Sequence, residues 1–398
     1  MTLVRIEEPR VKEPPQSGFA HHPVFRLGFR PFYLLAAAFA AISVPLWIAR
    51  YFGNLGALAR VDLNWHMHEM VFGFAIAVII GFVFTAGRNW TGLWTPRRGH
   101  LAALAGLWIA GRIAMLFAPP LLAAAVDLLF LPLAAYPIYS VLHRTGNKRN
   151  MFLVGLLALL TLINALFHAS VLGWLQMSSV TPVQAAILVI VMIESVIGGR
   201  VIPGFTANAI QGAKPVTNEK RDKISIALTA MAAVAWVANL PGPLAGAIAV
   251  AAAAAQATRV AGWMPHVTLR KPILWILHLS YAWIPVGLLM LGLASWGMTT
   301  SSAAFHVLTI GSMAGLIIGM ITRTALGHTG RPLNAGSSEL VMYVLIQLGV
   351  IARMLAAANV LRSEMLVATA AFWSAAFVLY VIVYGPYLLA PRVDGREG

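Results

Sequence analysis

The sequence contains no cysteine, and only 10% of its 398 residues are charged. A soluble globular domain carries about 25% charged residues. Without cysteine the chain forms no disulfide bond and offers no thiolate to a zinc site or an iron–sulfur cluster. Any bound metal must therefore be held by histidine, methionine, tyrosine, carboxylate or backbone groups.

Most of the residues are apolar. The chain is 60% hydrophobic, with a mean hydropathy of +0.80. Apolar stretches of about 20 residues recur along it, and each is long enough to cross a bilayer as a helix. The sequence therefore predicts an all-α integral membrane protein with about twelve transmembrane helices, at residues 31–52, 66–86, 100–117, 121–142, 152–174, 181–201, 224–240, 242–260, 273–296, 303–324, 338–360 and 364–387.

These spans form one expected transmembrane domain, residues 31–387, with a central loop at 202–223. The polar, Pro-containing start of the chain lacks the apolar segment of a signal peptide, so residues 1–30 are interpreted as an N-terminal tail. Residues 388–398 form a short C-terminal tail. No repeated motif is evident between the two halves of the chain.

The formal net charge of +15 has a topological explanation. Most Lys and Arg residues fall in the two tails and in the connections that follow the second, fourth, sixth and eighth spans. The opposite connections hold only Arg60 and Arg362. Because excess positive charge marks the cytoplasmic side, both termini of this multi-pass protein are expected to be cytoplasmic. The basic residues then contact anionic lipid, and nucleic acid is not an expected partner.

Histidines are the strongest candidates for metal ligands, because imidazole suits both iron and copper. Four lie near the outer ends of three spans and two lie nearer the inner side: His66, His68, His168 and His306, then His278 and His328. Taken singly, each is more often a hydrogen-bonded helix end than a ligand. Residues two apart on a helix point in directions that differ by about 200°. His66 and His68 are therefore not expected to ligate one ion from a regular helix.

Acidic and tyrosine residues within the spans are candidate proton carriers. Glu69 is expected on the same helical face as His66, where it would fix the orientation of that imidazole. Glu194 and Tyr281 are the other two candidates. Arg112 and Asp127 lie at equal distances from the Pro119-Pro120 turn, which predicts a buried ion pair with a structural role.

Arginines near the ends of the spans are candidate partners for carboxylates of a cofactor, since a guanidinium group forks onto a carboxylate. They are Arg200, Arg323, Arg331 and Arg353. The alternative for Arg200 and Arg323 is that they only complement the negative ends of their helices and extend to the lipid interface.

Several motifs, in this order along the chain, resemble those of the NnrS family. They are HPVFRLGFRPF, WHMHEMVFGF, GFVFTAGRNWTG, GGRVIPGFT, WILHLSYAW and GMITRTALGHTGRPL. The resemblance extends from about residue 22 to about residue 390. The family's histidine-bearing motifs fall on the six histidines given above, and its arginine motifs fall on Arg200 and Arg323.

The NnrS family consists of bacterial inner-membrane proteins that contain haem and copper and act in nitric oxide metabolism and resistance to nitrosative stress. The resemblance therefore implies a haem, of the b type, together with copper, and nitric oxide as ligand or substrate. Turnover as an NO or O2 reductase, with an electron donor that the sequence does not identify, is one alternative. A secondary transporter or metal permease is another, because about twelve spans also fit that class.

Overall fold

The computed structural model describes residues 18–54, 56 and 58–396, and every regular element there is a helix. The long helices are α1 (Phe29–Tyr51), α4 (Arg98–Phe117), α5 (Pro120–Arg144), α6 (Lys148–Val171), α7 (Val180–Ala209), α8 (Glu219–Val237), α9 (Gly242–Gly262), α10 (Pro272–Ser295), α13 (Ser337–Ala357) and α14 (Arg362–Leu389). Two further spans are each built from three consecutive pieces: α2 (Leu63–His68), η3 (Glu69–Ala75) and α3 (Ile76–Thr91), then α11 (Ser301–His306), η5 (Val307–Ala314) and α12 (Gly315–His328). Short 3₁₀ turns complete the set: η1 (Phe19–His21), η2 (Pro23–Phe25) and η4 (Pro265–Thr268).

Eleven of these helical segments are long and apolar enough to cross a membrane. They coincide with eleven of the expected spans, so the structure supports a multi-pass membrane protein. The remaining expected span, 224–240, forms α8, which does not reach the same hydropathy. Its first turns carry five charged residues in succession, Glu219 to Lys223.

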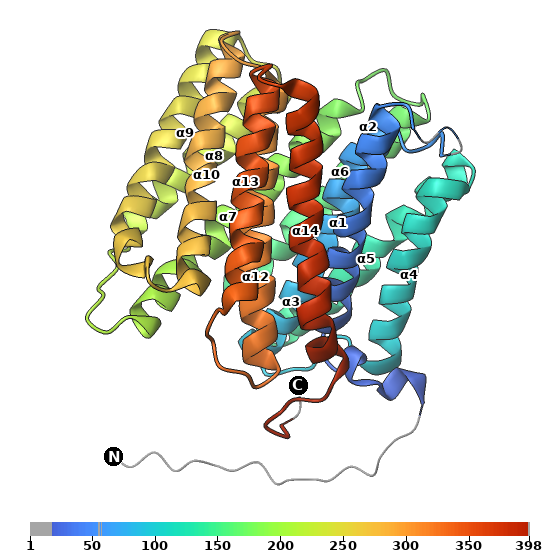
Figure 1. The fold of residues 1–398 in the computed structure, drawn as a ribbon, viewed down its shortest axis with the longest axis vertical. Helices are drawn as coiled ribbons and strands as arrows, with labels where there is room; N and C mark the ends of the chain where they lie inside the picture. The colour runs from blue at the N-terminus through green and yellow to red at the C-terminus, as the bar shows by residue number, and fades with distance from the viewer. Residues whose placement is uncertain (1–17, 55, 57, 397–398) are drawn as a thin grey trace.

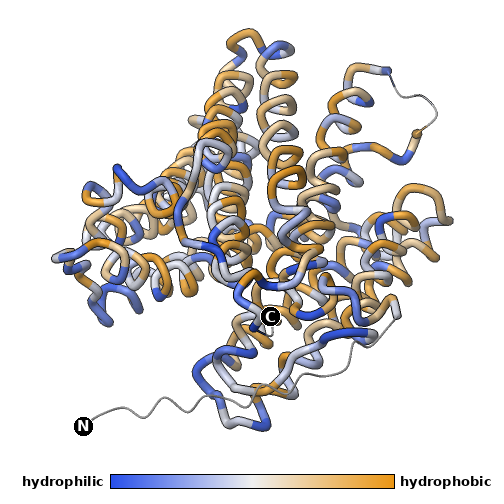
Figure 2. The backbone as a smooth tube through the Cα atoms, turned by 60° about the horizontal axis from the view of Figure 1, so that its bottom comes forward, coloured by the Kyte–Doolittle hydropathy of each residue, from blue (hydrophilic) through white to orange (hydrophobic). Residues whose placement is uncertain are grey.

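The helices run side by side in one bundle, and the first and last described residues lie at the same end of it (Figure 1). This end is called the inner end below, and the opposite end the outer end. In Figure 2 hydrophilic segments gather in the connections, while the helices are mostly apolar. α14 packs against α1 and α13, and so the last helix joins the first.

The connection after α7 is shorter than the sequence suggests. α7 continues through Pro203 to Ala209, and α8 begins at Glu219, so the loop expected at 202–223 narrows to residues 210–218. Proline inside a membrane helix is tolerated where neighbouring groups satisfy the freed backbone. The Thr206 hydroxyl lies on this last part of the helix and donates to the Ile202 carbonyl oxygen at 3.0 Å.

The two three-piece spans have the same construction. Each starts with six α-helical residues that end in a histidine, His68 or His306, and continues as π-helix before returning to α-helix. They are also the most deeply buried spans, with 78% of the apolar window inside the protein. A π-helical segment changes which residues share a face, and such segments are frequent at functional sites. This shared construction was not visible as a repeated motif in the sequence.

Helix α9 packs closely on α10 because small residues line the face of α9 that is turned toward α10. Ala249, Ala252 and Ala253 are buried there, and a Cβ atom on Gly246 would collide with the indole ring of Trp296. This packing explains how an Ala-rich stretch forms a well-placed membrane helix, because small residues let two helices approach closely.

Replacement of Gly246 by leucine is therefore expected to destabilise the protein by about 1–3 kcal/mol, the usual cost of overpacking a core. The measurement is the free energy of unfolding in detergent. Leu244→Ala, at a lipid-facing position that is 51% exposed, is the matched control and should leave the free energy unchanged. Equal stability of Gly246→Leu and the wild type would contradict this packing.

Candidate metal centre

Two histidines and an aspartate from three spans meet in the outer half of the bundle. His68 ends α2, Asp127 lies on α5 and His168 lies near the end of α6. The Nε2 atoms of His68 and His168 lie 3.1 and 3.0 Å from the same oxygen, Asp127 Oδ2. All three side chains are buried, and one potential ligand atom from each lies within 4.8 Å of the others.

A second shell of polar groups surrounds this His68–Asp127–His168 cluster. Glu69 Oε1 lies 3.0 Å from His68 Nδ1, and Glu69 Oε2 lies 3.2 Å from the guanidinium group of Arg112. Arg112 also forms an ion pair with Asp127 Oδ1. Asn164 donates from Nδ2 to Asp127 Oδ2 at 2.7 Å, and its Oδ1 lies 3.0 Å from His68 Nε2.

The charges in this cluster do not cancel without a further cation. Two carboxylates, Glu69 and Asp127, face a single guanidinium group, that of Arg112. Both nitrogens of His68 lie beside a carboxylate oxygen, an arrangement that a doubly protonated imidazolium satisfies. A metal ion at His68 Nε2, in place of that proton, would also supply positive charge. The cluster therefore needs positive charge beyond that of Arg112, from a protonated His68 or from a bound metal ion, because an unpaired buried negative charge is costly.

Local sequence explains how these groups reach one another. The side chain of Asp62 accepts from the backbone N–H of Trp65 at 2.8 Å and so fixes the start of α2. The Pro119-Pro120 turn sets α4 and α5 side by side, so that Arg112 and Asp127 lie at the same depth. The predicted Arg112–Asp127 ion pair is confirmed.

The prediction that Glu69 orients the imidazole of His66 was wrong, because Glu69 contacts a different histidine. Glu69 contacts His68 and Arg112, whereas His66 stacks on Trp47 with ring centroids 5.0 Å apart and planes 9° apart. α2 ends at His68 and the π-helix begins at Glu69, so the regular spacing that would align residues 66 and 69 does not apply. Sequence reasoning also missed Asp127 and Asn164 as members of the site. The signal for Asp127 was present, because an acidic residue inside a membrane span marks a functional position.

His66 belongs to a different group, here called the outer pair, with His306. These two imidazoles lie within electrostatic range of each other and of Arg353. His306 Nδ1 lies 2.7 Å from the Ser302 carbonyl oxygen, and Arg353 donates to the Ser302 hydroxyl at 3.1 Å. The buried Nδ1 of His66 has no hydrogen-bond partner among the described residues. The structure thus separates His66 from His68, as the helical spacing predicts.

The remaining histidines lie nearer the inner end and apart from both groups. His278 Nε2 lies 2.8 Å from the Thr206 hydroxyl, and both residues are buried. His328 lines a cavity of about 470 Å³ together with Arg149 and Arg200.

Two of the candidate arginines contact aromatic rings. The Arg323 guanidinium group lies 3.9 Å from the centre of the Phe205 ring, and that of Arg331 lies 3.7 Å from the centre of the Tyr387 ring. Of the four arginines expected to bind a cofactor, Arg200 lines the inner cavity and Arg353 lies beside the outer pair.

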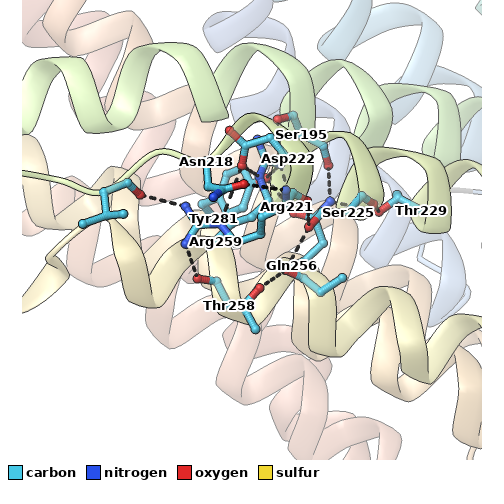
Figure 3. Close-up of polar contacts among 12 residues, drawn as sticks. Ser195, Asn218, Arg221, Asp222, Ser225, Thr229, Gln256, Thr258, Arg259 and Tyr281 are labelled. Carbon is cyan, nitrogen blue, oxygen red and sulfur yellow. Dashed lines mark hydrogen bonds and ion pairs between the residues drawn. The ribbon is translucent and has the colours of Figure 1, made fainter.

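Tyr281 lies in a separate polar network that joins α7, α8, α9 and α10 (Figure 3). Its hydroxyl donates to Gln256 Oε1 at 2.8 Å and accepts from Arg259 Nη1 at 2.6 Å. Arg259 also forms an ion pair with Asp222 at 2.9 Å. These hydrogen bonds tie Tyr281 to helix packing, whereas His278, three residues earlier, has its hydrogen bond with Thr206.

Removing the charge of Asp127 tests the electrostatic frame of the cluster. Asp127→Asn keeps the shape of the side chain but leaves Arg112 with one carboxylate. It is expected to lower the free energy of unfolding by about 1–3 kcal/mol, because buried N–H groups lose their charged acceptor while Glu69 still balances the charge of Arg112. Asp394→Asn is the control: the half-buried Arg392 guanidinium group holds the pKa of the exposed Asp394 below its usual range, yet an ion pair at the surface contributes little to stability. An equal, small effect of both changes would contradict the buried frame.

Comparison with known proteins assigns the chain to a family. The family described as NnrS protein matches residues 23–392, nearly the whole chain. A search of the curated proteins gives no match. The match covers both three-piece spans, the His68–Asp127–His168 cluster and the outer pair. The chain belongs to the NnrS family.

Proposed function

We propose that this protein acts in the bacterial response to nitric oxide by binding NO at a haem held within the membrane, next to a separate metal ion, which we take to be copper. Membership of the NnrS family supports the link to nitric oxide. The observation that carries the metal-binding part is the buried His68–Asp127–His168 cluster.

The donor set of this cluster fits a transition metal. Imidazole nitrogen and carboxylate oxygen bind copper, iron and zinc, at bond lengths of about 2.0–2.2 Å. Ligand atoms on one such ion lie about 3 Å apart, which is the separation between Asp127 Oδ2 and each histidine Nε2. Glu69 lies at Nδ1 of His68, the nitrogen that would not bind the metal. A carboxylate in that position commonly orients a ligating imidazole. The ion would replace the proton on His68 and balance the excess negative charge.

The haem would be held by the outer pair. The Ser302 carbonyl oxygen accepts from His306 Nδ1–H, which leaves His306 Nε2 as the candidate ligand atom, and the buried Nδ1 of His66 has no hydrogen-bond partner within the described part of the chain. Arg353 lies within electrostatic range of both imidazoles, where a guanidinium group would bind a propionate. A haem held there through one of these imidazoles would supply an iron that binds NO, an apolar gas that reaches an intramembrane site through lipid.

The orientation of the protein is part of the proposal. The positively charged connections lie at the inner end, so we assign that end, with both termini, to the cytoplasmic face of a bacterial inner membrane. Crossing by α8 gives twelve spans in total.

Two alanine substitutions are expected to remove the two cofactors independently. His168→Ala should abolish metal binding, because it removes one of three ligands, and should leave the haem absorption band in place. His306→Ala should abolish the haem band and its shift on addition of NO, and should leave the metal content unchanged. Metal analysis by mass spectrometry and optical spectra of purified protein measure these quantities.

The control is His143→Ala, at an exposed histidine of the inner end, which should change neither quantity. Wild-type protein that is colourless and free of metal, when made with ample haem and copper, would refute the proposal. Steady-state NO consumption with an added electron donor would show turnover in place of simple binding.

The absence of cysteine allows a direct test of topology. In the proposed orientation, Lys214→Cys, in the connection 210–218, should react with a membrane-impermeant maleimide only from the cytoplasmic side. Gln176→Cys and Ala238→Cys should react only from the outer side, because twelve crossings place both there. Reaction of Ala238→Cys from the cytoplasmic side would show that α8 does not cross.

A further inference from the structure

Glu194 lies at the midpoint of α7, in the middle of a membrane span. Its carboxyl group accepts a hydrogen bond from the Ser312 hydroxyl of η5 at 2.5 Å. No ion pair joins it to any residue that the structure describes. An ionisable side chain inside a membrane is costly, and such residues usually line a cavity and carry protons or ions.

The buried cation that contacts the residue next to Glu194 is already engaged. Arg259 forms its ion pair with Asp222 and donates to the backbone oxygen of Ser195, the residue next to Glu194 (Figure 3). The Ser195 hydroxyl accepts from Gln256 at 3.1 Å, so this network fixes α7 without using the Glu194 carboxylate. With no cation to balance it, the negative form of Glu194 is disfavoured, and a proton is the natural counter-charge.

Glu194 is connected with the inner end through internal space. It lines a cavity of about 110 Å³, together with Tyr33 of α1. This cavity adjoins the larger one of about 470 Å³, because both are lined by Phe82, Ile197, Val201 and Met320. Ile197 and Val201 follow Glu194 at intervals of three and seven residues, and therefore lie on the same face of α7.

The larger cavity is suited to hold water, because it is lined by polar side chains and is large enough. Its walls carry polar side chains, and two of its residues, Arg149 and Arg200, are exposed at the inner end. Arg200 donates to Asn150 Oδ1 at 3.0 Å, and Asn150 is buried. Water occupies a cavity when it is roomy and offers several polar partners, and this space does both. Beyond it, Glu194 and Tyr33 are the polar groups of the smaller cavity.

We propose that Glu194 is a proton-binding site that exchanges its proton with the aqueous phase at the inner end through these two cavities. The carboxylate takes a proton from hydronium and leaves water, and the reverse step releases it; no electron transfer is involved. The inference goes beyond the proposed function and needs neither haem nor metal. The titratable or charged groups around this route are Tyr33, Tyr281, Arg259, Asp222, Arg149, Arg200 and His328.

Infrared difference spectroscopy of the purified protein, between low and high pH, tests the proposal. A protonated carboxyl group in apolar surroundings gives a C=O band apart from the amide bands. The wild type should show such a band, which disappears as the pH rises and shifts when D2O replaces H2O. Glu194→Gln should lack it, and Glu194→Asp should move it. Glu364→Gln, at an exposed acid in the first turn of α14, is the matched control and should leave it unchanged.

The route is tested by blocking it. Val201→Trp fills the space where the two cavities meet and should slow the D2O shift of the Glu194 band at least tenfold, while Val378→Trp, on a lipid-exposed face of α14, should not. A band that remains at its wild-type position in both Glu194→Gln and Glu194→Asp would overturn the assignment. An equally fast shift in Val201→Trp would overturn the route.

Discussion

The buried guanidinium group of Arg112 holds the outer half of this protein together. It lies between Glu69 and Asp127, and each of these carboxylates also contacts His68. Without Arg112, two negative charges would face each other away from water, which is unfavourable. With it, one negative charge remains, and that remainder creates the demand for a cation. The contacts that join η3, α4 and α5 and the candidate metal site therefore share one electrostatic arrangement.

The π-helical segments decide how the histidines are shared between sites. In a regular helix, His66 and Glu69 would lie on one face. Here the change to π-helix after His68 directs Glu69 toward His68 and Arg112. His66 instead stacks on Trp47 and belongs to the outer pair with His306. The second three-piece span brings His306 to the same end by the same construction. A chain without cysteine thus presents two separate groups of imidazoles in one half of the bundle.

The fold was largely accessible from the sequence, because membrane helices are encoded by the length and polarity of local segments. Eleven spans and the Arg112–Asp127 pair follow from hydropathy and from distance to a turn. The helix ends were less accessible, since α7 continues past Pro203 to Ala209. The site was accessible only in part. His68 and His168 could be named as metal ligands, but their shared carboxylate, Asp127, depends on how α5 packs against α6, which local sequence does not encode.

X-ray absorption spectroscopy of the metal bound to the purified protein tests most directly whether the His68–Asp127–His168 cluster binds a transition metal. We expect imidazole scattering from two histidines together with a carboxylate oxygen, and the loss of one imidazole contribution or of the metal itself in His168→Ala. A spectrum without imidazole scattering, or one that His168→Ala leaves unchanged, would contradict it.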